Sequence, residues 1–172
     1  MTVEYIFSVD PGKATGVAFA RITEKEAAEV VYAGIIPGGL DGFIEWLELT
    51  DDAYYVARTD CAMYHPDEYK RMDYQVNIVA EVFQSRMNRF VPDLEPVRIE
   101  GVLIDRFGKQ VNWQKAQDKA MVGDEFLKNH GLWITGSMVD HEDGRDANDA
   151  LLHLFAYLMR RKHKPTLDYY WR

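Results

Sequence analysis

The chain has a single cysteine, Cys61, and no long run of apolar residues. One cysteine cannot form an intramolecular disulfide, so nothing in the sequence requires an oxidising compartment. No segment approaches the ~20 consecutive apolar residues that a membrane-spanning helix needs. The N-terminus also lacks the basic start and apolar run of a signal peptide. These absences predict a cytoplasmic protein with no membrane partner.

Basic residues are in the minority, with 20 Lys and Arg against 28 Asp and Glu and a net charge of -8. A negative net charge counts against a nucleic-acid partner. However, from Arg160 onward the bases outnumber the acids. Acids gathered around a metal ion also add to the negative total, although the ion neutralises them in the working protein. The charge is therefore only a weak objection to a nucleic-acid partner.

The composition is that of a globular domain, since 47% of the 172 residues are apolar and 13% are aromatic. A chain of this length can bury a core as one unit. We therefore expect a single domain over residues 1–172, with a tyrosine-rich irregular segment at 51–75 and a basic C-terminal tail at 160–172.

Hydrophobic periodicity predicts an alternation of strands and helices. The predicted strands span residues 3–10, 15–22, 29–37, 76–83 and 131–139. The predicted helices span residues 40–49, 97–107, 114–129 and 143–164. Short links between the first three strands favour an antiparallel meander.

Four carboxylates fall where this order of elements would bring them together. Asp10 ends the first strand in an Asp-Pro-Gly turn, and Glu81 lies late in an apolar strand, where an unpaired charge is costly. Asp146 and Asp149 open the last helix, and their spacing of three places them on one face. If that helix packs across the ends of the first and fourth strands, the four acids meet.

Four such carboxylates would repel one another unless cations lay between them. Hard divalent ions prefer carboxylate and water oxygens, so Mg²⁺ is the expected cofactor and Mn²⁺ a substitute. Two ions ~3.5–4 Å apart would activate a water and stabilise the leaving 3′ oxygen of a phosphodiester. We therefore predict that Asp10, Glu81, Asp146 and Asp149 are both catalytic residues and metal ligands.

Each acid also has a plainer interpretation. Asp10 suits a turn, and Asp146 is favoured at a helix N-terminus by the dipole alone. Glu81 could pair with a nearby arginine. Asp143 and His153 are possible additional site residues, but Asp143 equally suits a helix N-cap and His153 an ordinary position on a helix face.

Three motifs in order, "FSVDPGKATGVAFA", "IVAEVF" and "RDANDALLH", resemble those of the RuvC-type Holliday junction resolvases of the RNase H-like (retroviral integrase-like) superfamily. The family pattern is Asp-Pro-Gly followed by Thr-Gly, then a strand-borne Glu near a Phe, then Asp-x-x-Asp-Ala on the last helix. In this chain the corresponding residues are Asp10-Pro11-Gly12 with Thr15-Gly16, Glu81 with Phe83, and Asp146-Ala147-Asn148-Asp149-Ala150. The segment "EPVRIEGVLID" followed by "GRDANDALLH" is more similar to divergent members from bacteriophages.

The resemblance implies an α/β fold of the RNase H-like type. Its five-stranded mixed sheet has three antiparallel strands followed by parallel strands, and helices flank it. The implied activity is a Mg²⁺-dependent, structure-selective DNA endonuclease that resolves Holliday junctions or other branched DNA as a homodimer. A phage-encoded member would work in the cytoplasm of its bacterial host.

Branched DNA would need basic side chains near the carboxylates to contact phosphates. Each candidate could instead be an ordinary solvated side chain. The candidates are Lys13, Arg86, Arg89, Lys115, Lys119 and Arg145.

Two other functions fit the same motifs. One is a nuclease of the same fold that cuts RNA or RNA–DNA hybrids, for example in ribosomal RNA processing. The other is a nonenzymatic DNA-binding relative, although the presence of all four acids argues against it. An actin-like ATPase would need a duplicated domain, for which 172 residues leave no room.

Overall fold

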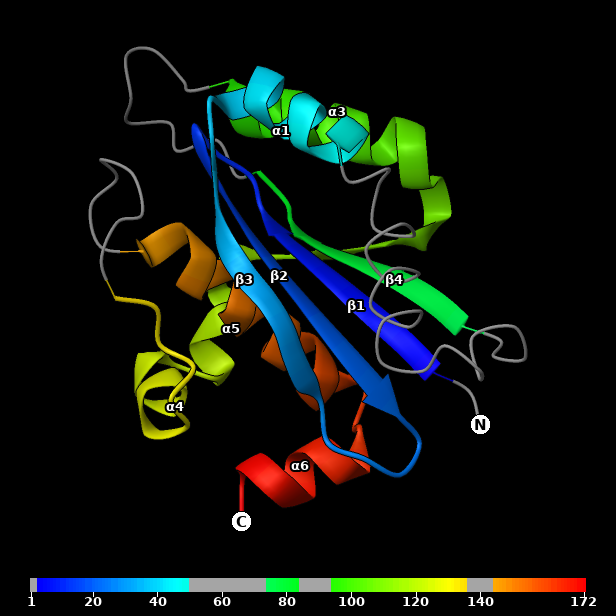
Figure 1. The fold of residues 1–172 in the computed structure, drawn as a ribbon, viewed down its shortest axis with the longest axis vertical. Helices are drawn as coiled ribbons and strands as arrows, with labels where there is room; N and C mark the ends of the chain where they lie inside the picture. The colour runs from blue at the N-terminus through cyan, green and yellow to red at the C-terminus, as the bar shows by residue number, and fades with distance from the viewer. Residues whose placement is uncertain (1–2, 50–73, 84–93, 136–143) are drawn as a thin grey trace.

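The computed structural model describes residues 3–49, 74–83, 94–135 and 144–172 and has at its centre a five-stranded mixed sheet (Figure 1). The strand order is β3-β2-β1-β4-β5. The first three strands pair antiparallel. Strand β4 pairs parallel with β1, and β5 pairs parallel with β4. The strands are β1 (Val3–Asp10), β2 (Ala14–Thr23), β3 (Glu29–Pro37), β4 (Tyr74–Glu81) and β5 (Val111–Gln114). The predicted fold class is confirmed.

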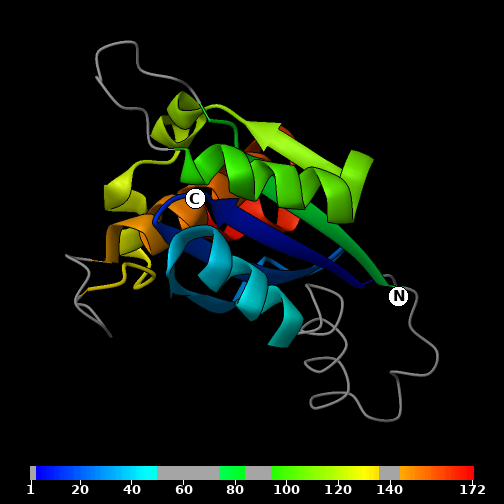
Figure 2. The same ribbon diagram turned by 90° about the horizontal axis from the view of Figure 1, so that it is seen from above.

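Helices cover both faces of this sheet, which Figure 2 shows from above. Helices α1 (Gly39–Leu49) and α3 (Glu95–Phe107) lie together on one face, and the long helix α5 (Arg145–Arg160) crosses the other. The other helices of the described residues are the 3₁₀ turns η2 (Gly108–Gln110) and η3 (Ala116–Met121), and the short helices α4 (Asp124–Asn129) and α6 (Lys164–Tyr170). Within the described residues, no helix has the length and apolarity to cross a membrane.

Two hydrophobic cores follow from the alternation of side chains along the strands. In β1 the odd positions, from Val3 to Val9, pack against α1 and α3. Ile6, at an even position, packs against α5. The same alternation applies in β4, where Ile78 faces the first core and Val79 the second. Even positions of β1 and odd positions of β4 therefore face α5.

The predicted fifth strand was wrong, because β5 is the segment Val111–Gln114 and residues 131–135 form no strand. Residues 136–139 of that prediction lie outside the described residues. Leu132 and Ile134 do pack against the α5 core, which explains the apolar run. The Asn148 amide accepts a hydrogen bond from Ile134 N–H at 2.9 Å and donates to the Ile134 carbonyl at 3.0 Å. The Asn148 side chain thus makes the backbone hydrogen bonds that a neighbouring strand would otherwise make.

The predicted helix at 114–129 was also wrong. It is divided into β5, η3 and α4, and Gly123 separates the last two with a left-handed φ of 77°. The last helix ends earlier than predicted, at Arg160, and α6 follows after Lys162, whose φ is 56°. Most of the tyrosine-rich segment 51–75 lies outside the described residues, and its final two residues belong to β4.

Candidate functional site

Asp10 and Glu81 lie side by side at the carboxyl ends of two parallel strands. Val9 of β1 is in register with Ala80 of β4, so the next residue on each strand is an acid. By alternation, both carboxylates project toward α5. Three residues of α5, namely Asp146, Asp149 and His153, belong to the part of the helix that meets this end of the sheet.

Gly16 lets the start of α5 approach the sheet beside Asp10. It is the register partner of Asp10 across β1 and β2. A Cβ at this position would lie only 1.8 Å from the backbone oxygen of Asp146. The adjacent turn is closed by Thr15, whose hydroxyl donates to the Gly12 carbonyl at 3.0 Å. The Asp-Pro-Gly and Thr-Gly motif thus fixes Asp10 and lets the helix that carries Asp146 and Asp149 pack beside it.

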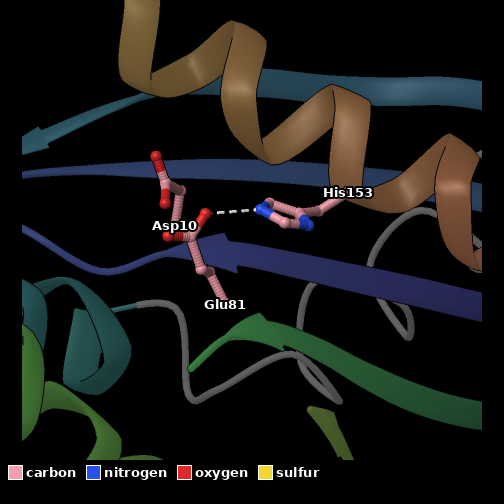
Figure 3. Close-up of side chains that lie close together, drawn as sticks. All are labelled: Asp10, Glu81 and His153. Atoms are coloured by element: carbon pink, nitrogen blue, oxygen red, sulfur yellow. Dashed lines mark hydrogen bonds and ion pairs between the residues drawn. The ribbon is translucent and has the colours of Figure 1, made fainter. Parts of the chain in front are cut away.

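The centre of the site is formed by Asp10, Glu81 and His153, which face one another in Figure 3. One potential ligand atom from each lies within 4.8 Å of the others. His153 is fully buried, and its Nε2 lies 2.6 Å from Oε2 of Glu81. Two carboxylates and an imidazole at this spacing are a donor set that suits a divalent ion.

Gln114, at the end of β5, fixes the orientation of this histidine. Its amide nitrogen donates to the His153 carbonyl at 3.2 Å, which leaves its amide oxygen 2.9 Å from Nδ1. That oxygen can only accept, so Nδ1 carries a proton. Both ring nitrogens then face oxygen acceptors, which a protonated imidazole satisfies with two donors. When the ring is neutral, Nε2 is the nitrogen left for a metal.

Lys119 of η3 links Asp149 to this centre. Its Nζ lies 2.5 Å from Oδ2 of Asp149 and 3.4 Å from Oε2 of Glu81. Burial lowers the pKa of Lys119, but the hydrogen bond with Asp149 and the surrounding carboxylates outweigh it, so the pKa is raised. The lysine is therefore a firmly charged counter-ion within the acid cluster.

The two strand acids respond oppositely to this environment. Burial raises the pKa of Asp10 well above its usual value, and the charge of Glu81 raises it further. The charges of Asp149 and Asp146 act in the same direction, against a partial lowering by Lys119. Burial also raises the pKa of Glu81, but the hydrogen bond from His153 and the charge of Lys119 prevail, so its pKa is lowered. Without a metal, Asp10 is the less compensated of the two strand acids.

A cleft of about 490 Å³ opens beside these acids, and both Lys119 and Asp149 line it. Its wall also includes Arg145, an exposed residue at the start of α5, and Trp133. Two basic side chains beside the carboxylates are suited to hold a polyanion next to them.

The other predicted residues are more scattered. Lys13 is exposed and lines a separate hollow of about 400 Å³ with Arg98 and Glu95. Lys115 is exposed where η3 begins. Arg86, Arg89 and Asp143 lie outside the described residues.

Sequence reasoning missed Gln114 and the contacts of Lys119 with the acids. Gln114 is the last residue of a four-residue strand, and the periodicity assigned it to the start of a helix, so its register with Glu81 was hidden. The available signal for His153 was its spacing of four from Asp149, which places both on one helix face.

Comparison with known proteins supports the fold. No protein-family model and no curated protein matches the chain. A structure of Thermus thermophilus RuvC is 11% identical, with a TM-score of 0.50 over 91% of this chain and 96% of that one. T. thermophilus RuvC in complex with a Holliday junction substrate is 10% identical, with a TM-score of 0.53 over 96% of this chain and 98% of that one. At this identity the similarity shows the fold, and this chain has the RuvC-type, RNase H-like fold.

Proposed function

We propose that this protein is a metal-dependent, structure-selective DNA endonuclease that resolves Holliday junctions or other branched DNA, as a divergent, bacteriophage-type member of the RuvC group. The observation that carries the proposal is the meeting of Asp10 and Glu81 with the acids and histidine of α5 at one end of the sheet. The fold shared with a protein solved on a Holliday junction substrate adds support.

The donor set fits divalent ions. Asp10, Glu81 and His153 would hold one ion, and Glu81, Asp149 and Asp146 would supply ligands to a second. When bound, Mg²⁺ or Mn²⁺ would supply a water nucleophile at neutral pH and compensate the negative charge that develops on the departing 3′ oxygen. The site accordingly needs no serine or cysteine nucleophile.

The side chains around the acids would position the substrate. Arg145 and Lys119 line the cleft at the acid cluster and would contact the phosphates next to the cleaved bond. Lys13 and Lys115, together with Arg86 and Arg89, would contact phosphates farther along the arms. His153 is oriented by Gln114 and would act as a ligand, with Asp143 as a possible further ligand.

The substrate is tested with labelled four-way junction, flap, linear duplex and RNA–DNA hybrid, each incubated with Mg²⁺, Mn²⁺ or EDTA. We expect metal-dependent nicking of branched DNA, and none by Glu81→Gln. Cleavage of the hybrid alone would favour the RNA-directed alternative. Junction binding without cleavage in either metal would favour a nonenzymatic DNA-binding protein.

A homodimer is the proposed assembly, and α3 offers a self-complementary surface for it. Val97 and Ile104 on its outer side are 42% and 56% exposed. In an antiparallel pairing centred near Gly101, Val97 of each copy would face Ile104 of the other, and Arg98 would face Asp105. Light scattering should show a dimer for the natural chain and a monomer for Asp105→Arg, with recovery when Arg98→Asp is added. An unchanged mass for Asp105→Arg would reject this interface.

We also propose that residues 1–172 act as one nuclease domain and that a bacterial cytoplasm is its setting. Both hydrophobic cores are built on the same sheet, which supports a single unit. Limited proteolysis that released a stable fragment lacking either core would contradict this.

A further inference from the structure

Lys119 lies where a second cation would be needed between two of the acids. We propose that its ammonium occupies one of the two metal positions of the resting site, so that the metals load in a fixed order and the second must displace Lys119. This inference rests on the proposed metal-dependent function and concerns how that site is filled.

The contacts of Lys119 are those of a substitute ion. Its Nζ lies against Oδ2 of Asp149 at 2.5 Å and against Oε2 of Glu81 at 3.4 Å. An ammonium is a compact point charge, and between two carboxylates it compensates part of the negative charge that a bound divalent ion would compensate. Glu81 would bridge the two positions, because the same Oε2 also faces His153.

The two positions differ in what already fills them. The first lies between Asp10, Glu81 and His153, whose ligand atoms are within 4.8 Å of one another, and its contact with Lys119 is the longer one, 3.4 Å from Nζ to Oε2 of Glu81. An ion there would leave the 2.5 Å contact of Lys119 with Asp149 in place. The second, between Glu81 and Asp149, cannot accept an ion while the ammonium remains between these carboxylates.

The backbone around Lys119 is fixed, so displacement is a movement of its side chain. Asp118, only 6% exposed, accepts a hydrogen bond from Lys115 N–H at 2.8 Å. Its other oxygen lies 2.5 Å from Nη2 of Arg160 at the end of α5. These contacts tie η3 to the helix that carries Asp149. The cleft of about 490 Å³, which Lys119 itself lines, gives the displaced ammonium room beside the proposed phosphate position.

Calorimetric titration with Mn²⁺ alone, without DNA, tests the inference. We expect the natural protein to bind two ions with clearly different affinities. Lys119→Met should tighten the weaker site about tenfold or more, because no cation has to leave, and should tighten the other site by a clearly smaller factor. Lys119→Arg retains the charge and should keep the weaker site weak. Lys109→Met, which removes an exposed lysine of η2, is the control and should match the natural protein.

Thermal unfolding gives an independent readout. In EDTA, Lys119→Met should melt at a lower temperature than the natural protein, because Asp10, Glu81 and Asp149 lose the positive charge beside them. Saturating Mn²⁺ should raise its melting temperature more than that of the natural protein.

Three results would overturn this inference but not the proposed function. The natural protein could bind two Mn²⁺ ions with equal affinity, or both proteins could bind a single Mn²⁺. Lys119→Met could also leave the affinity of the weaker site unchanged or lower it further. Absence of saturable Mn²⁺ binding in both proteins, together with absence of cleavage, would instead reject the proposed function and this inference with it.

Discussion

Gln114 holds His153 through two hydrogen bonds, one from its amide nitrogen to the backbone carbonyl at 3.2 Å and one to its amide oxygen from Nδ1 at 2.9 Å. Both residues are buried, so neither bond can be replaced by water at low cost. The pair joins the edge strand β5 to α5 and turns Nε2 toward Glu81.

The first prediction concerns this pair. Gln114→Leu should lower the affinity for Mn²⁺ about tenfold, because His153 can then place a proton on Nε2, and outer hydrogen bonds of this kind tune metal affinity by this order. It should also reduce the free energy of unfolding by about 1–3 kcal/mol, since buried polar groups lose their partners. Gln117→Leu, at an exposed position of η3, is the control. Natural Mn²⁺ affinity in a folded Gln114→Leu protein would show that the glutamine does not position the histidine.

The second prediction concerns Asp10, whose pKa burial and the charge of Glu81 raise. A group whose pKa is higher in the folded state contributes stability that is present below its unfolded pKa and is lost as pH rises through the folded value. At neutral pH, where Asp10 is ionised in the unfolded chain, its raised pKa therefore lowers the stability of the metal-free fold. Asp10→Asn should be more stable than the natural protein in EDTA at pH 7, and the difference should shrink as pH falls toward about 4.

Urea unfolding at several pH values measures this, with the exposed Glu48→Gln as control. The same Asp10→Asn protein should gain little stability from Mn²⁺ and should not cleave. If Asp10→Asn were less stable than the natural protein at pH 7 in EDTA, the raised pKa of Asp10 would be wrong.

The third prediction concerns Gly16, where a Cβ would lie 1.8 Å from the Asp146 backbone oxygen. Gly16→Ala should push the start of α5 away from β2 and cost about 3 kcal/mol of stability. Cleavage should fall even under conditions where the protein remains folded, because the helix carries Asp146 and Asp149. Gln117→Ala, at an exposed position of η3, adds no atom against another backbone and should leave stability nearly unchanged. Equal stabilities for the two variants, measured by urea unfolding, would contradict the close packing.

The fourth prediction concerns Arg145, which lines the cleft beside the acids. Arg145→Gln should weaken junction binding and reduce the slope of log affinity against log salt by about one, because one phosphate contact is lost. Affinity for Mn²⁺ should not change. Lys25→Gln removes an exposed charge from the β2–β3 turn, at the opposite end of the sheet, and should have little effect on either quantity. Identical salt slopes for the two variants would place the DNA elsewhere.

The parts of the fold that were predictable are those where one periodicity dominates. The first three strands are short, largely apolar runs, α5 has apolar residues at helical spacing, and the acids at the ends of β1 and α5 follow from these patterns. The fifth strand was not predictable, because Val111–Gln114 is short and half polar. The apolar residues Leu132 and Ile134, in contrast, have the spacing that is typical of a strand. That apolar run packs on α5 through the Asn148 amide, a tertiary contact that no local pattern reveals.

The same distinction holds for the site. Asp10 and Glu81 could be placed together because both end buried strands that pair in register. Lys119 could not, since it reaches the acids from a 3₁₀ turn whose position depends on the ion pair between Asp118 and Arg160. Gln114 depended in turn on the correct assignment of β5.

Crystals of the protein soaked in Mn²⁺, and examined for anomalous scattering, test the metal centre most directly. We predict an anomalous peak within ligand distance of Asp10, Glu81 and Nε2 of His153, with Lys119 withdrawn from Asp149 wherever a second peak is present. Mn²⁺ bound elsewhere on the protein, with these three side chains holding no peak at saturating concentration, would contradict the proposed site.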